Sequence, residues 1–166
     1  MPTIIDATVG GSAANSYATL AEAVDYMSKR LNATNWTGTD TVKEQALITA
    51  TFRIDQENFL GYRTSSTQAL KWPRSNVPVV GEEYGGYYAS DAIPVPIKKA
   101  VYEYALELLT NDTLTESNLS NYKSVSVGPI EVEFNQPVSS GLLPDMVSRL
   151  LRGLRVGGSG VVMVRG

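Results

Sequence analysis

The chain has 166 residues and a mass of 17.9 kDa, the size of one domain, and its 43% apolar and 19% charged content is typical of a protein with a packed core. It contains no cysteine and no histidine, which excludes disulfides, thiolate metal sites and histidine-based catalysis. The net charge of −3 and the pI of about 5.0 disfavour a nucleic-acid-binding protein, because such proteins normally have a basic face.

Residues 1–18 lack the basic and apolar regions of a signal peptide and are predicted to form an extended N-terminal arm. Within this arm, Thr3–Asp6 could pair as a short strand, and Gly10–Asn15 is expected to be a flexible joint. A first helix is predicted to begin at Thr19, because Thr19 and Glu22 have the spacing of a capping box. Apolar residues then recur at helical intervals, namely Leu20, Val24, Met27 and Leu31.

A second helix is predicted to begin at Thr41, where Thr41 and Glu44 repeat the capping spacing. Gly61 would suit its C-cap. The apolar residues expected on its buried side are Ala46, Leu47, Ala50, Ile54 and Phe59. Residues 62–95 follow as a long inserted loop, and a connection of this length is usually functional or held by a partner. Disorder is the alternative, which the aromatic residues of the loop disfavour.

Pro94 or Pro96 is predicted to lie in the first turn of a third helix that ends at Asn111. Residues 123–134 are predicted to form a β-hairpin, because two segments with alternating apolar residues flank Gly128–Pro129. If Val127 pairs with Ile130, one face carries Val125, Val127, Ile130, Val132 and Phe134. The other face then carries Ser124, Ser126, Glu131 and Glu133. A hairpin this short is expected to pack on another part of the protein.

A fourth helix is predicted to begin at Pro144 and to end near Gly153, and residues 156–166 form a C-terminal tail tethered by Gly157–Gly160. From Ser140 onward the chain has four arginines and one aspartate, which suggests an acidic partner for the tail. Solvated arginines near a helix C-terminus are the alternative. No apolar run is long enough to span a membrane, and we expect no membrane partner.

These elements predict a mainly α fold. It is a small helical bundle of about four helices with one hairpin, a long inserted loop and extended arms at both ends. Residues 1–18 are the N-terminal arm, residues 19–155 the bundle domain, and residues 156–166 the tail.

The sequence contains no pattern typical of a catalytic, cofactor-binding or metal site, and we expect none of the three. The acidic pairs Glu82–Glu83 and Glu131 with Glu133 fall in a loop and on the polar face of the hairpin, whereas acid–base catalysis needs carboxylates in unequal environments. The patch that most resembles a nucleic-acid site consists of Arg63, Lys71, Trp72 and Arg74. Its alternative interpretation is a core tryptophan, or a cation–π partner of an arginine.

Several segments, taken in order, carry a resemblance to a known family. They are Asn15-Ser-Tyr-Ala-Thr-Leu-Ala-Glu22, Lys43-Glu-Gln-Ala-Leu-Ile-Thr-Ala-Thr51, Ile54-Asp55, Gly61-Tyr-Arg63, Thr67-Gln-Ala-Leu-Lys-Trp-Pro-Arg74, Ala89-Ser-Asp-Ala-Ile-Pro94 and Lys123-Ser-Val-Ser-Val-Gly-Pro-Ile-Glu-Val-Glu-Phe134. Over about residues 15–151, the chain resembles the head–tail adaptor (head completion) proteins of tailed bacteriophages. Members of that family are often labelled DnaT-like single-stranded DNA-binding proteins. The most specific part is the block that contains Arg63, Gln68, Trp72, Pro73 and Arg74, which we interpret as a structural motif.

The resemblance implies a non-enzymatic subunit that assembles in the host bacterial cytoplasm into a ring of about twelve copies at the head–tail interface of the virion. The ring would bind the portal protein on one side and a tail or tail-completion protein on the other. DNA would pass through it without specific binding. The label of the family implies the alternative function, single-stranded DNA binding.

Two further hypotheses concern sites. The apolar strip of the tail is expected to bind the portal protein as an added strand, and its residues are Val161, Val162, Met163, Val164 and Arg165. Glu131 and Glu133 are expected to face the lumen or rim of the ring, where negative charge repels phosphates. A plain outer surface is the alternative for these two glutamates.

Overall fold

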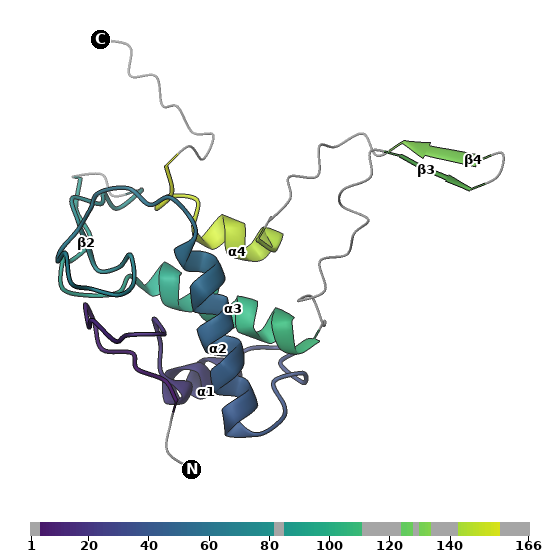
Figure 1. The fold of residues 1–166 in the computed structure, drawn as a ribbon, viewed down its shortest axis with the longest axis horizontal. Helices are drawn as coiled ribbons and strands as arrows, with labels where there is room; N and C mark the ends of the chain where they lie inside the picture. Colours follow the sequence, from purple (N-terminus) through teal and green to yellow (C-terminus); the bar gives the residue numbers. More distant parts are fainter. Residues whose placement is uncertain (1–3, 82–84, 111–123, 128–129, 134–142, 157–166) are drawn as a thin grey trace, which may run out of the picture.

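A computed structural model describes residues 4–81, 85–110, 124–127, 130–133 and 143–156. These residues form four helices, α1 (Leu20–Ser28), α2 (Asp40–Asp55), α3 (Val95–Thr110) and α4 (Asp145–Leu150), as Figure 1 shows. They also form two antiparallel strand pairs, β1 (Tyr62–Arg63) with β2 (Arg74–Ser75) and β3 (Ser124–Val127) with β4 (Ile130–Glu133). The prediction of a small, mainly α bundle with one hairpin is therefore confirmed. In this part of the chain, no helix is long and apolar enough to cross a membrane.

The helix α3 is the centre of the bundle, because α1, α2 and α4 all pack against it. The α2–α3 contact is the most extensive, and the apolar residues predicted for the second helix within its observed bounds, Ala46, Leu47, Ala50 and Ile54, are buried. The fully buried side chains at this contact and around it include Leu47, Ala50, Ile54, Ile97, Ala100, Val101 and Ala105. Burial of this kind removes apolar surface from water at about 25 cal/mol per Å², and it is the main stabilising term of the fold.

The start of α1 is as predicted, whereas the second helix begins earlier than expected. The Thr19 side chain accepts a hydrogen bond from the Glu22 backbone, and Glu22 reciprocates, which completes the capping box. The N-cap of α2 is Thr39, not Thr41, and its hydroxyl accepts from the backbone of Val42. Because Thr39 and Thr41 both precede a polar first turn, the sequence spacing alone did not separate them.

The predicted end of α2 is also wrong. The helix ends at Asp55 with Gln56 as its C-cap, five residues before Gly61. Gly61 has a positive φ of 69° and packs against the backbone of Ser75, where an added Cβ would lie 2.1 Å from the Ser75 carbonyl oxygen. A glycine is required there by the close approach of two chain segments rather than by a helix end.

The N-terminal segment contains neither helix nor strand between residues 4 and 18, and its last residues belong to the core. Ala14, Ser16, Tyr17 and Ala18 are buried. The Asn15 side chain closes the segment on itself, because it accepts from the Asp6 backbone (2.8 Å) and donates to the Ile4 carbonyl (2.9 Å). The predicted strand at Thr3–Asp6 is absent from its described residues, 4–6.

The inserted loop of residues 62–95 is ordered in its described parts. The strand pair β1–β2 closes it near its start, with Tyr62 opposite Ser75 and Arg63 opposite Arg74. Further on, Pro78 bridges to Tyr87. The Trp72–Pro73 peptide bond is cis.

The fourth helix is shorter than predicted, since it ends at Leu150 and its last apolar residues continue as a turn. Leu151 and Leu154 in this turn are nonetheless buried. The chain then runs along the segment after α2. The Leu60 N–H donates to the Leu154 carbonyl (2.9 Å), and the Val156 N–H donates to the Asn58 carbonyl (2.8 Å).

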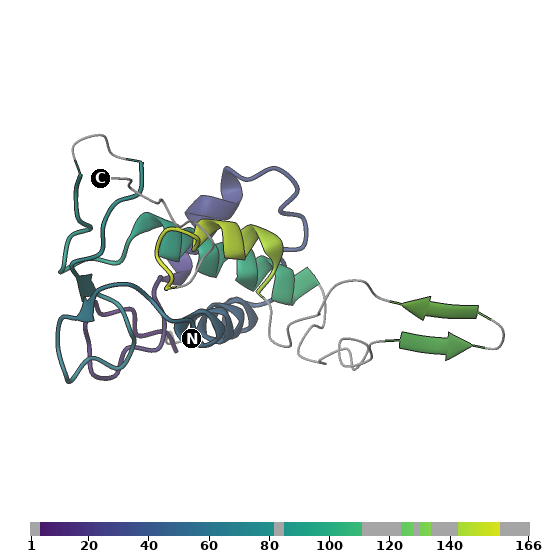
Figure 2. The ribbon, with the colours of Figure 1, turned by 90° about the horizontal axis from the view of Figure 1, so that it is seen from above.

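The hairpin has the predicted register, with Val127 opposite Ile130 and Ser124 opposite Glu133. In Figures 1 and 2 it lies apart from the helices, and none of the described helices packs on it, contrary to the expectation that it would pack on another part of the protein. Its connection at Gly128–Pro129, and Phe134, lie outside the described residues.

Candidate interaction surfaces

The block around Trp72 is the most specific motif of the sequence, and the structure buries its residues Gln68, Trp72 and Pro73. Trp72 is 1% exposed and meets Phe59 edge to face, with ring centroids 5.6 Å apart. Its burial agrees with the core interpretation of this residue. A buried indole offers no stacking platform for a nucleotide base.

Tyr17 and Asp55 fix this block to the bundle. The Tyr17 hydroxyl donates a hydrogen bond to the Asp55 carboxylate and accepts one from the backbone N–H of Trp72 (3.3 Å). The same carboxylate accepts from the Lys71 N–H (2.8 Å). Burial and the neighbouring Asp55 charge raise the pKa of Tyr17 far above its ordinary value, so this hydroxyl stays a donor. Three segments that are distant in sequence therefore meet at one hydroxyl.

The charged and polar side chains of the block are used internally. Arg74 donates to the carbonyls of Leu60 (2.6 Å), Gly61 (2.6 Å), Phe59 (3.2 Å) and Lys71 (3.3 Å). Burial lowers the pKa of Arg74 below its ordinary value. The Gln68 amide donates to the carbonyls of Leu70 (2.8 Å) and Pro73 (3.1 Å), and Arg63 donates to the Gln68 carbonyl. These side chains replace the backbone pairing that a helix or sheet would supply.

The other described cations are also largely occupied. Ion pairs join Lys29 with Asp25, Arg30 with Glu103, Lys98 with Glu22, Arg149 with Asp145, and Arg155 with Glu57. Lys71 donates to two backbone carbonyls. The described cations whose side chains make no hydrogen bond or ion pair with another described residue are Lys43, Arg53, Lys99 and Arg152. They come from three different elements and form no motif in the sequence.

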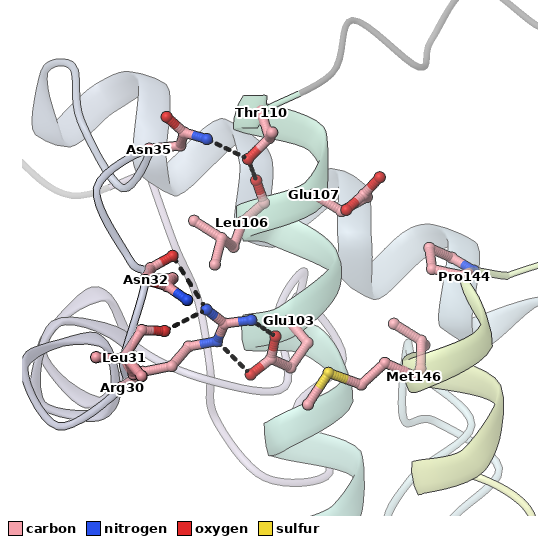
Figure 3. A pocket seen from close by; sticks show the side chains of 11 residues that line it. Arg30, Leu31, Asn32, Asn35, Glu103, Leu106, Glu107, Thr110, Pro144 and Met146 are labelled. Atoms are coloured by element: carbon pink, nitrogen blue, oxygen red, sulfur yellow. Dashed lines mark hydrogen bonds and ion pairs between the residues drawn. The ribbon is translucent and has the colours of Figure 1, made fainter.

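A pocket of about 340 Å³ lies between the end of α1, the C-terminal half of α3 and α4 (Figure 3). Arg30 forms a two-pronged pair with the Glu103 carboxylate, at 2.8 and 2.9 Å, and donates to the carbonyls of Leu31 and Asn32. The hydrogen bond to Glu103 raises the pKa of Arg30 above its ordinary value. Arg30 and Glu103 neutralise each other, and the other charged residue that lines the pocket is Glu107.

Large apolar side chains remain exposed on several elements. The most exposed are Leu31, Val80, Tyr87, Tyr62, Phe52, Val95 and Val156, at 60–84%. Scattered single apolar residues are normal on a surface. A groove of about 470 Å³ also exists, between the start of α1, Ile5 and the start of α2, and its walls are mostly apolar.

The structure describes some of the predicted site residues and not others. The motif residues Arg63, Gln68, Trp72, Pro73 and Arg74 lie together around β1 and β2. Glu131 and Glu133 lie on β4 opposite Ser126 and Ser124, but the surroundings of their side chains are outside the described residues. The strip from Val161 to Arg165 lies outside them as well. Among the residues that the structure describes, no group of three or more acidic side chains could hold a metal ion.

Sequence reasoning assigned no role to Tyr17, Asp55 or Glu103. The first two stand in segments that carry the family resemblance, which was the available signal, although no local pattern links them. Glu103 lies on the buried side of α3, where the apolar periodicity gave no reason to expect a charge.

The comparisons with known proteins give one match. Over residues 1–166 the chain matches the model of a family described as "Putative DnaT-like ssDNA binding protein". No curated protein and no solved structure matches it.

Proposed function

The chain belongs to this DnaT-like family, and from that premise we propose that it is a non-enzymatic structural subunit of the head–tail connector of a tailed bacteriophage. It works as a ring of about twelve copies that binds the portal protein and a tail protein and continues the DNA channel. The connector role also draws on the ordered set of motifs from Asn15 to Phe134. The alternative, which the family description names, is single-stranded DNA binding.

The observation that favours a structural subunit is that most of the described cations bind groups of the same chain. A single-stranded DNA-binding surface needs a basic groove with aromatic platforms. Here Arg30, Arg74 and Arg155 bind carboxylates or carbonyls of the same chain, and Trp72 is in the core. Among the described cations, phosphate contacts would fall first to Lys43, Arg53, Lys99 and Arg152, which make no hydrogen bond or ion pair with another described residue. The net charge of −3 further disfavours phosphate binding and suits a channel through which DNA must slide.

Exposed apolar side chains support assembly with other proteins. Phe52 and Leu31 are 64% and 84% exposed, on or beside different helices, and burial against neighbours would remove this surface from water. A heterologous contact between two different faces of the same subunit closes into a ring when its rotation permits.

The test compares assembly with DNA binding in the same sample of full-length protein. Native mass spectrometry and negative-stain images should show closed rings, and the rings should co-sediment with purified portal. Titration with labelled single-stranded DNA at several salt concentrations should show no binding with the steep salt dependence of phosphate contacts. A monomer that binds single-stranded DNA, with a salt slope that falls when Lys43, Arg53, Lys99 and Arg152 are replaced by glutamine, would establish the alternative instead.

A further inference from the structure

The groove between α1 and α2 has the chemistry of a binding site for an apolar segment that carries a positive charge. Its floor and walls include Ile5, Leu20, Ala21 and Val24, and its volume is about 470 Å³. Ala21 is exposed and Val24 is 45% exposed, so the apolar wall is open to solvent. The neighbouring Ile4 and Val42 are 45% and 41% exposed.

One end of the groove is acidic. Asp40, the first residue of α2, is exposed and belongs to no ion pair among the described residues. Glu44 lies one turn further, is 5% exposed, and accepts a hydrogen bond from the Ile4 N–H at 3.1 Å. Asp40 therefore offers an exposed carboxylate beside the apolar groove, which favours an occupant with a cation next to its apolar residues.

The chain itself contains a segment with this chemistry. Val161–Val164 is a run of four apolar residues, Arg165 follows directly, and no acidic residue occurs between residues 156 and 166. The turn after α4 is a weaker match, because Arg149 is already paired with Asp145 and Arg155 with Glu57. The tail strip is therefore the segment whose charge and apolarity best complement the groove.

The strip can meet the groove of its own copy or the groove of another. Val156 is hydrogen-bonded to Asn58, beyond the C-terminal end of α2, whereas the groove lies at Asp40, the N-terminal end of that helix. With 16 residues at 1.5 Å each, α2 separates these two points by about 24 Å. Residues 157–160 let Val161 lie at most about 18 Å from Val156. Arg165, nine residues beyond Val156, can lie at most about 32 Å from it, so chain length permits the groove of either copy. The proposed ring requires a contact between two different surfaces of neighbouring copies, and a strip bound in the groove of a neighbour supplies that contact.

We infer that the strip Val161–Arg165 of one copy binds the α1–α2 groove of a neighbouring copy, with Arg165 at the acidic end beside Asp40 and Glu44. The contact joins two different surfaces, so it is heterologous and can propagate around a ring. The inference rests on the proposed self-association of the chain, and it adds which surfaces make that contact.

The absence of cysteine from the chain allows a direct test by cross-linking. Full-length Ala21→Cys protein is mixed with affinity-tagged full-length Met163→Cys protein under assembly conditions and then oxidised. The expected result is a mixed disulfide-linked dimer on non-reducing gels. The matched control replaces Ala21→Cys with Phe52→Cys, an exposed position about three turns along α2 from the groove, and it should give only background.

A charge exchange tests the polar end of the contact. Adding Arg165→Glu to the Met163→Cys protein should lower the yield of the mixed dimer by about two- to fivefold, the effect of a partly exposed ion pair. Adding Asp40→Lys to the Ala21→Cys protein as well should restore the yield. The yield of the mixed dimer recovers only if positions 165 and 40 meet. A general change in solubility or folding would not restore it.

Assembly is followed by native mass spectrometry in parallel, so that the two proposals can fail separately. Rings whose mixed cross-link is no stronger than the Phe52→Cys control would overturn the groove assignment and leave the proposed function standing. Protein that stays monomeric would overturn both. A strip that cross-links to portal but never to Ala21→Cys would assign it to the portal protein and overturn the inference.

Discussion

The α2–α3 pair and the loop of residues 59–75 both contribute buried side chains to the core, but they are stabilised in different ways. The helices satisfy their own backbone groups and meet through apolar side chains such as Leu47 and Val101. In the loop, side chains satisfy backbone groups that a helix or sheet would otherwise pair. Arg74 and Gln68 donate to backbone carbonyls, and Asp55 accepts from a backbone N–H. Helical contacts therefore spread their energy over many residues, whereas the loop concentrates it in a few whose loss leaves buried polar groups unpaired.

The largest expected effect is that of Trp72→Ala. This change removes the side chain that fills the space between the loop and the bundle, and large-to-small core substitutions of this kind cost about 3–5 kcal/mol. Urea unfolding should show a correspondingly lower midpoint. Tyr87→Ala, in the inserted loop of residues 62–95 and at a side chain that is 71% exposed, should change stability by less than about 0.5 kcal/mol. Equal midpoints for both variants would mean that the loop is not part of the core.

Next in size is Arg30→Ala, which leaves the Glu103 carboxylate buried without its partner. The Glu103 side chain is 5% exposed, and breaking a buried pair from one side costs about 3 kcal/mol. The double variant Arg30→Met with Glu103→Leu should recover most of this loss, because neither charge then remains. Arg149→Ala, in a pair whose side chains are 70% and 78% exposed, is the control and should cost about 0–0.5 kcal/mol. If the two single variants unfold alike, the Arg30–Glu103 pair is accessible to water.

A smaller loss is expected for Tyr17→Phe, which keeps the ring but removes the hydroxyl shared by Asp55 and the Trp72 N–H. The cost should be about 1–2 kcal/mol, because buried polar groups lose a partner. Tyr62→Phe, at a ring that is 70% exposed, should be neutral. Thermal unfolding of the two variants side by side measures the difference in stability. A neutral Tyr17→Phe would mean that the Tyr17 hydroxyl does not stabilise the loop.

The smallest effect appears only at high pH. Burial, followed by the hydrogen bond to Glu103, raises the pKa of Tyr26 to about 12 from its ordinary value of 10.0. A raised pKa favours the protonated form in the folded state, so its stabilising contribution is complete below about pH 10 and is lost as the pH rises through about 12. Phenolate absorbance should show a late-titrating tyrosine that Tyr26→Phe removes. A wild-type titration finished near pH 10 would contradict this.

The difference between the two regions explains what the sequence could predict. Apolar periodicity located all four helices and the hairpin register, because burial of a helix face or a pleated strand leaves a pattern in the sequence. No such pattern marks the bond from Arg74 to the Gly61 carbonyl or the bond from Trp72 to Tyr17, which join residues 13 and 55 positions apart and depend on the final fold. The N-cap of α2 was misplaced for a local reason, since Thr39 and Thr41 are both suitable caps. The α1–α2 groove has no sequence signature, because it combines residues from three separate segments.

The fastening of the chain after α4 has a mechanical consequence. Val156 is hydrogen-bonded to Asn58, Leu60 to Leu154, and Arg155 is paired with Glu57 at 2.8 Å. A pulling force applied to the residues beyond Val156 is therefore carried first by the segment Glu57–Leu60, which is continuous with α2, rather than by the six-residue helix α4 alone. In the proposed ring, tension between neighbouring subunits would pass into α2, with which this segment is continuous. Resistance to such a force depends on the rate at which these hydrogen bonds and this ion pair break, rather than on the equilibrium stability of the fold.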